Sequence, residues 1–172
     1  MKNIYILFVL FLSLGCKTNQ NASEQSGAYL KGISCPDSGN CTFEVLKNSN
    51  LNIKTDDFGK LYPEVTPGNK VVIKFQYKKI VPAKTMDGSY SEFVYLEVNE
   101  NEPQLILKDQ DLQKVKMLFG RICRCSGPMG YFRVTSGNLY LFNGSGKLNM
   151  NLTFKVNKVP QIITEVKESI NY

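Results

Sequence analysis

The sequence predicts an all-β protein, an antiparallel β-sandwich or barrel of about eight short strands that could end in a short helix. Three observations predict this fold class. Apolar and polar residues alternate with a period of two over several stretches, which is typical of half-buried strands. Gly, Pro, Asn and Asp turns separate these stretches at intervals of roughly 10 to 20 residues. No long crossover helix connects them, which argues against a parallel α/β fold.

The first half of the chain contains four expected strands. Two short ones are expected at residues 41–46 and 51–55. Residues 71–77 alternate between apolar and polar side chains, which indicates one buried face. Residues 91–98 carry apolar side chains on both faces. This pattern is typical of a central strand that is covered on two sides.

The second half contains the clearest strand pattern. Every second residue of 147–156 is apolar, so one face of this strand should be buried and the other should meet water. Residues 139–142 form a short apolar run, and the turn at 143–146 tolerates positive φ. The two strands should therefore close as a hairpin. Further short strands are expected at residues 105–107 and 115–123.

Two segments could be helical. Residues 109–116 suit a short turn. Residues 160–170 place four apolar side chains at helical spacing behind Pro160, a residue suited to the first turn of a helix. We therefore expect the chain to end in a short helix.

Composition narrows the function classes. A chain of 172 residues that is 42% hydrophobic and 21% charged suits one globular domain. The chain contains no His, which excludes a Ser-His-Asp triad, a Cys-His pair and an imidazole metal ligand. We therefore expect a protein that is not an enzyme, with no catalytic residues, no cofactor and no metal site.

The first sixteen residues resemble the signal peptide and lipobox of bacterial lipoproteins. A positively charged start is followed by an apolar run at 4–14, too short to span a bilayer permanently, and Gly15 precedes Cys16. Leu is usual at the third position before the cysteine, and Ser13 stands there. The resemblance implies that residues 1–15 are removed and that Cys16 is acylated with fatty acids such as palmitate. Its acyl chains would then anchor the protein to a membrane.

The expected organisation is a signal peptide over 1–15, a lipidated cysteine and flexible tether over 16–27, and one β-rich domain over 28–172. The Asn- and Lys-rich composition resembles that of small envelope lipoproteins of the Bacteroidetes. Surface-exported lipoproteins of that phylum often carry an acidic run after the cysteine, which this chain lacks. The resemblance therefore implies a location at the outer membrane, facing the periplasm. An ordinary secretory signal, the alternative, would also export the protein.

Four cysteines remain for disulfide bonds in an exported domain: Cys35, Cys41, Cys123 and Cys125. Cys123 and Cys125 are two residues apart, so a bond between them would be strained if both lie on a strand. We therefore expect both to bond with the loop that carries Cys35 and Cys41. The alternative is a local bond between Cys35 and Cys41.

A chemical interpretation of the same cysteines is a second candidate function. Together with Met117 and Met129, Cys123 and Cys125 offer the soft sulfur ligands that Cu(I) prefers. A dithiol at this place could also exchange disulfides. Thiol or Cu(I) handling is therefore one alternative to a structural role.

The distribution of charge indicates a binding surface. The chain has a formal net charge of +6, and residues 112–160 contain Lys and Arg but no acidic residue. Within them, residues 120–133 gather every Arg of the chain, whose planar guanidinium suits phosphate or carboxylate, with a Tyr that can stack on a ring. Strands of opposite charge that pair across the sheet are the alternative explanation. The candidate binding residues are Arg121, Arg124, Tyr131 and Arg133.

Export from the cytoplasm limits which partners we expect for this protein. An unidentified envelope partner, anionic like a lipid head group or lipopolysaccharide, fits the basic surface. A nucleic-acid partner is not expected, because the protein leaves the cytoplasm.

Residues 136–140, Ser-Gly-Asn-Leu-Tyr, resemble the Ser-Gly-x-x-Tyr motif of periplasmic lysozyme-inhibitor lipoproteins, which are compact β-barrels with disulfides. The second motif of that family, Tyr followed by Lys-Gly, is absent after Tyr140. A positively charged domain would also repel a cationic lysozyme. The sequence therefore favours a lipid-anchored, non-catalytic binding or structural module of the cell envelope. Lysozyme inhibition and thiol or Cu(I) handling are the alternatives.

Overall fold

The structure is a computed structural model that describes residues 35–83, 88–144 and 146–171. The expected signal peptide, Cys16 and the tether lie outside these residues. Within them, the chain forms ten strands and one short 3-10 helix, which confirms the predicted all-β class. None of the described helical structure has the length and hydropathy needed to cross a bilayer. The elements are β1 (Gly39–Thr55), β2 (Leu61–Pro67), β3 (Lys70–Lys79), β4 (Tyr90–Val98), β5 (Gln104–Lys108), η1 (Asp109–Val115), β6 (Leu118–Cys123), β7 (Gly130–Arg133), β8 (Gly137–Gly144), β9 (Lys147–Phe154) and β10 (Glu165–Asn171).

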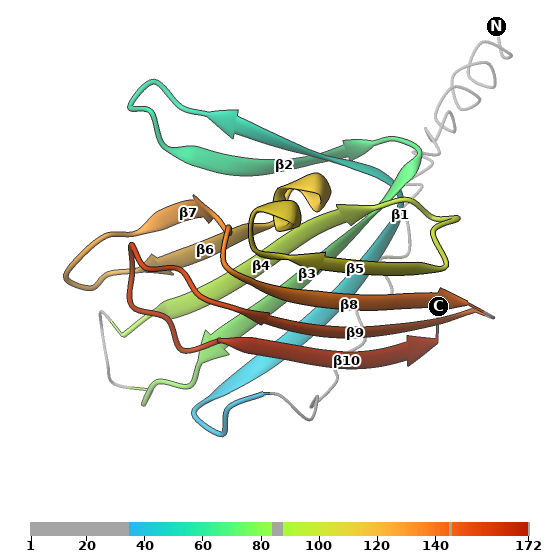
Figure 1. Ribbon diagram of the computed structural model, residues 1–172. Helices are drawn as coiled ribbons and strands as arrows, with labels where there is room; N and C mark the ends of the chain where they lie inside the picture. The colour runs from blue at the N-terminus through green and yellow to red at the C-terminus, as the bar shows by residue number, and fades with distance from the viewer. Residues whose placement is uncertain (1–34, 84–87, 145, 172) are drawn as a thin grey trace, which may run out of the picture.

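Six strands form a closed antiparallel barrel in the order β1-β2-β7-β6-β4-β3 (Figure 1). β1 is one strand of 17 residues, so the expectation of two short strands at 41–46 and 51–55 is wrong. Its first part pairs with β3 and its last part with β2, and the register shifts between Leu46 and Ser49. Asn48 lies at this irregularity with φ of 50°, which bends the strand without ending it. The β1–β2 hairpin therefore projects from the rest of the molecule (Figure 1).

The other four strands form a second sheet, in the order β10-β9-β8-β5, that packs against the barrel. β8 and β9 are the predicted hairpin. The predicted alternation of β9 is confirmed, because Leu148, Met150, Leu152 and Phe154 are all buried. The Phe154 ring lies 5.7 Å from the ring of Phe119 in β6, centroid to centroid. Both rings belong to the large core between the barrel and the second sheet.

β4, the predicted central strand, lies between β3 and β6 and is buried on both faces. Val94 and Leu96 face the large core, whereas Tyr95 belongs to a smaller cluster. Leu61 of β2 and Tyr131 of β7 pack against this smaller cluster. Its fully or nearly buried members come from four different barrel strands: Leu51, Val72, Tyr95 and Leu118.

The helix expected over residues 160–170 is wrong. Residues 165–171 instead form β10, which pairs with β9 over its whole length. β9 would otherwise present an unpaired edge, and a strand at this edge satisfies backbone groups of both segments. The turn expected at 109–116 is confirmed as η1, which ends where Lys116 adopts a left-handed φ of 53°. The strand that follows begins at Leu118, three residues later than expected.

A buried carboxylate joins the barrel to the second sheet. Glu92 of β4 is 1% exposed, and its two oxygens accept the backbone N–H groups of Ile162 and Ile163, each at 2.7 Å. Tyr90 donates its hydroxyl to the same carboxylate. Burial, together with this hydrogen bond, raises the pKa of Tyr90 to about 12, so the hydroxyl keeps its proton at neutral pH. Glu92 thereby holds the segment that leads into β10 against the barrel.

The disulfides are local, so the expected cross-link between the two cysteine pairs is wrong. Cys35 bonds with Cys41 and Cys123 with Cys125, with Cα–Cα distances of 5.7 and 5.4 Å. Cys41 lies in β1 and Cys123 in β6, with β3 and β4 between them. β6 is three strands away from β1 in either direction round the closed barrel, so the two strands lie on opposite sides of it, whereas a disulfide spans at most about 7 Å between Cα atoms. β6 ends at Cys123, so Cys125 does not share a strand with it as the sequence argument assumed.

Replacing Glu92 by Gln should destabilise the fold. One carboxylate oxygen becomes an amide NH₂ group that faces a backbone N–H donor, and we expect a loss of about 2 kcal/mol in the free energy of unfolding. Urea denaturation measures this loss. Glu168→Gln is the matched control: burial raises the pKa of Glu168, so its charge is unfavourable in the fold and its removal should not destabilise. Equal stability of Glu92→Gln and the wild type would contradict the role of Glu92.

Peptide mapping of the non-reduced protein should recover only local disulfides. Trypsin cuts after Arg124, between Cys123 and Cys125. The two short peptides on either side should stay joined without reductant and separate with it. A peptide that joins the 35–41 loop to Cys123 or Cys125 would contradict the pairing.

Candidate functional site

The Arg-rich segment at 120–133 comprises the end of β6, a connection, and β7. The two strands pair so that Gly120 lies opposite Tyr131. A Cβ atom at residue 120 would lie 2.4 Å from Cε1 of Tyr131, so only glycine lets this ring lie across β6. The ring also lies beside Tyr95, with centroids 6.2 Å apart. Packing therefore fixes the position of Tyr131.

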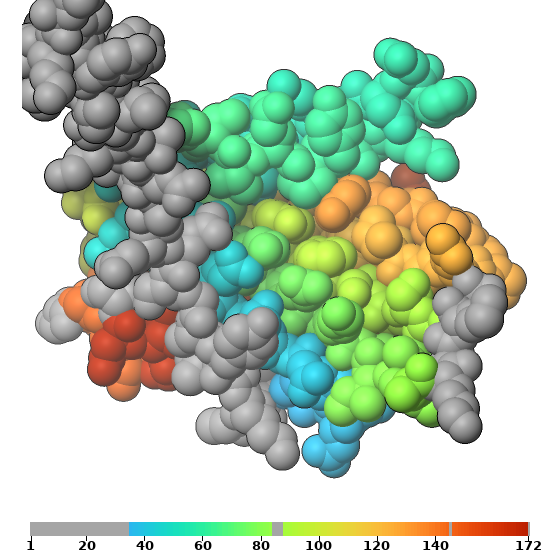
Figure 2. All heavy atoms as spheres, turned by 180° about the vertical axis from the view of Figure 1, so that it is seen from behind, coloured from blue at the N-terminus to red at the C-terminus, as the bar shows by residue number. Residues whose placement is uncertain are grey.

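A groove with a volume of about 420 Å³ opens beside Tyr131. Three chain segments line it: the end of the β1–β2 turn, β7 with the residues next to it, and the connection from β9 to β10. Figure 2 shows the first two of these segments, in teal and orange, next to each other on the surface. The residues that matter for its chemistry are Lys60, Leu61, Met129, Tyr131, Arg133 and Lys158.

The turn that carries Lys60 is fixed by a carboxylate. Oδ1 of Asp56 accepts the backbone N–H groups of Phe58 and Lys60, at 2.9 and 2.8 Å. Gly59 has φ of 76°, a conformation that favours glycine. The turn therefore presents Lys60 at a defined place on the rim of the groove.

The connection that carries Lys158 is also held by side chains. Gln161 accepts the backbone N–H of Val156 at 2.6 Å and donates to the carbonyl of Ile163 at 2.7 Å. Val159 is buried next to Lys158. These contacts fix the backbone on both sides of Lys158, whose side chain is exposed.

Three basic side chains line the groove. Lys60, Arg133 and Lys158 are exposed at its rim, and none of the described residues that line it is acidic. Burial raises the pKa of Tyr131, so the phenol at the floor stays neutral. Nη1 of Arg133 donates to Gln113 at 3.1 Å, which orients the guanidinium. Such a site attracts an anion at its rim and an apolar or ring-shaped group at its floor.

The structure brings two of the four candidate binding residues, Tyr131 and Arg133, into this groove. Arg121 is 5% exposed and lies inside the fold, where Nη1 donates to the carbonyl of Pro128 at 2.7 Å. Its guanidinium carbon lies 5.5 Å from the centre of the Tyr90 ring. Arg121 therefore holds the connection to β7 in place. Arg124 is exposed in that connection and does not line the groove.

The sulfur-bearing residues proposed for Cu(I) lie in different surroundings in the structure. Cys123 and Cys125 are bonded to each other, Met117 is fully buried, and Met129 lines the groove. Within the described residues, no group of three or more Cys, Asp or Glu side chains could hold a metal ion. Tyr140 of the 136–140 motif is exposed on β8, in the second sheet and apart from the groove.

Sequence reasoning missed Lys60, and it included Lys158 only in the basic stretch at 112–160, not among the candidate binding residues. Each is a single Lys in a turn, a context in which most lysines are simply solvated. Only the barrel closure, which pairs Leu61 with Tyr131, brings the first of them to β7. No local sequence signal marks either residue as part of a site.

Comparisons with family models, with curated proteins and with solved structures find no match to this chain.

Proposed function

We propose that this protein is a lipid-anchored cell-envelope module that binds, without catalysis, an anionic ligand in the cationic groove. The observation that carries the proposal is the meeting of Lys60, Arg133 and Lys158, from three separate segments, above the floor formed by Tyr131. The three cations line one groove, and no described residue that lines it is acidic, so an anion would be attracted there.

The floor of the groove narrows the ligand class. Leu61 and Met129 add apolar surface beside the Tyr131 ring, and Met129 is 45% exposed. A ligand with both an anionic head and an apolar part would contact the rim and the floor together. A phosphate-bearing amphiphile, of the kind that forms envelope membranes, has this chemistry.

The lipobox supports the envelope location. Gly15 and Cys16 at the end of an apolar run are the features from which acylation is inferred. The two local disulfides are consistent with an oxidising compartment. An acylated Cys16, with a tether before the domain, would hold the groove close to a membrane surface.

Binding of a short-chain phosphatidylglycerol to the detergent-solubilised protein should depend on the groove. We expect Arg133→Ala and Lys158→Ala each to weaken binding about fivefold, since a basic side chain near a lipid phosphate contributes about 1 kcal/mol. Calorimetric titration measures the effect. Lys147→Ala, which removes an equal charge at the other end of β9, is the control and should bind like the wild type.

Two further ligands test which part of phosphatidylglycerol the groove recognises. Short-chain phosphatidylcholine tests the need for net negative charge, and inorganic phosphate tests the need for the apolar part. Equal losses in Lys147→Ala and Arg133→Ala would show a diffuse charge effect and would contradict the groove.

Membrane attachment should depend on Cys16. In fractionated cells, Cys16→Ser is expected to leave the membrane fraction or to remain as the unprocessed precursor, because no acyl chain is added. Ser23→Ala, in the tether, should fractionate like the wild type. A Cys16→Ser protein that is processed to the mature size and still fractionates with the membrane like the wild type would overturn the lipid anchor.

A further inference from the structure

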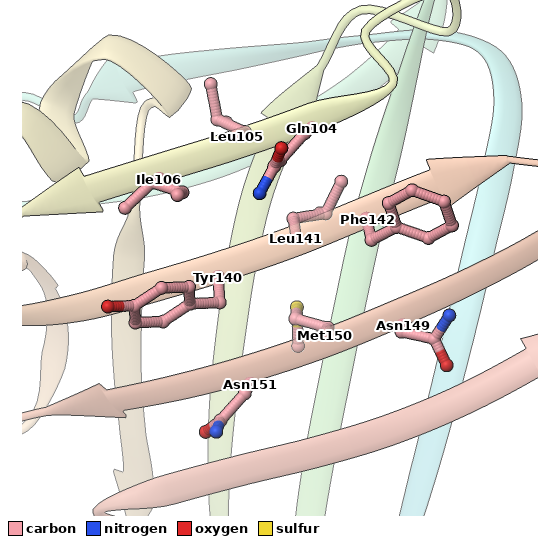
Figure 3. Close-up of a pocket in the computed structure, with 9 residues that line it drawn as sticks. All are labelled: Gln104, Leu105, Ile106, Tyr140, Leu141, Phe142, Asn149, Met150 and Asn151. Atoms are coloured by element: carbon pink, nitrogen blue, oxygen red, sulfur yellow. The ribbon is translucent and has the colours of Figure 1, made fainter.

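The outer face of the second sheet carries two rings that are about half exposed. Tyr140 and Phe142 of β8 are 54% and 53% exposed, and Ile106 of β5 is 57% exposed. Leu141 and Met150, which alternate with the outward residues, are buried in the core. The rings therefore project from the side of the sheet that faces away from the barrel (Figure 3).

The strand register arranges this face into two rows. In one row, Tyr140 lies between Ile106 of β5 and Asn151 of β9. In the next row, Phe142 lies between Gln104 and Asn149. Each ring therefore has an Asn beside it on β9, as Figure 3 shows. The rows are two residues apart along β8, which is about 7 Å.

These residues line a shallow hollow of about 230 Å³. None of the described residues that line it is charged. We propose that this face binds a neutral polysaccharide chain. The inference is independent of the cationic groove, which lies on different strands and has a different chemistry.

The chemistry of the face matches that of a sugar chain. The faces of Tyr and Phe rings carry partial negative charge, so they attract the weakly positive C–H groups of a sugar ring. The amides of Gln104 and Asn151 can both donate and accept hydrogen bonds, as sugar hydroxyl groups do, and the NH₂ group of Asn149, whose oxygen accepts from Ser169, can still donate. Two rings in successive rows would contact two successive sugars. A free anion would gain little here, because the lining residues provide no cation and Lys167, next to Asn151 in the same row, is paired with Glu165 at 2.6 Å.

A second copy of the chain is the competing occupant, and the composition of the face disfavours it. A stable interface buries about 800 Å² on each partner around an apolar core. On this face, an amide side chain of β9 lies beside each ring in the same row. Asn149 is already engaged with β10, because Ser169 donates its hydroxyl to Oδ1 of Asn149 at 2.7 Å. The apolar area is therefore broken up by polar groups.

Affinity electrophoresis tests the proposal with the full-length protein in detergent micelles. Native gels would contain dextran, mannan, laminarin or xylan, each a neutral polymer, and retardation would be compared with a gel that contains none. We expect retardation by at least one polymer. Tyr140→Ala and Phe142→Ala should each weaken the association at least about fivefold, and the double variant should abolish it.

Matched variants separate ring contact from general surface changes. Tyr140→Phe keeps the ring and should bind within about twofold of the wild type. Phe58→Ala removes a ring that is 88% exposed at the tip of the β1–β2 hairpin and should bind like the wild type. Unchanged thermal unfolding of every variant would show that the fold is intact, as expected for exposed positions.

Three outcomes would overturn the proposal. They are no retardation by any of the four polymers, retardation of the double variant equal to that of the wild type, and a shift of the double variant from dimer to monomer in size-exclusion chromatography. The last outcome would show that a second copy covers the face. Loss of lipid binding in Arg133→Ala with sugar binding retained would show that the two sites act separately.

Discussion

The buried carboxylate of Glu92 is the constraint on which the arrangement of both sheets depends. A buried charge is tolerated only when hydrogen bonds replace its water, and the N–H groups of Ile162 and Ile163 do so. Their position fixes where the chain enters β10. Arg121, opposite Glu92 in the register of β4 and β6, holds the connection to β7 through Pro128. One cross-strand pair thus organises two distant connections.

The cationic groove follows from the way the barrel closes. β2 and β7 meet through the single register pair of Leu61 and Tyr131, whereas the other barrel strands pair over longer stretches. A short pairing leaves side chains on either side of it partly uncovered, and the groove lies there. Gly120 makes the closure possible, because any side chain would occupy the place of the Tyr131 ring. The shape of the groove therefore depends on backbone geometry and packing and not on charge.

The two candidate surfaces differ in chemistry because they lie on different architectural parts. The groove gathers Lys60 and Lys158 from connecting segments and Arg133 from the end of β7, places where long charged side chains can reach solvent. The outer face of the second sheet carries rings and amides from strands, where the pleat places alternate side chains in register. An envelope module with both surfaces could contact an anionic amphiphile and a neutral polymer at the same time. The two surfaces consist of different residues, and different experiments test them.

The period-2 pattern by itself determined the all-β class, the β8–β9 hairpin and the buried face of β9, because alternation directly reports which side chains leave water. The C-terminal segment misled the same reasoning, since Val166 and Ile170 fit a helical period and also share one face of β10. Only the tertiary structure decided that β10 is a strand, because the free edge of β9 and the carboxylate of Glu92 come from outside the segment. It likewise decided the disulfide pairs and the gathering of Lys60 and Lys158 beside Arg133, because strand order and barrel closure set the distances between residues far apart in the chain.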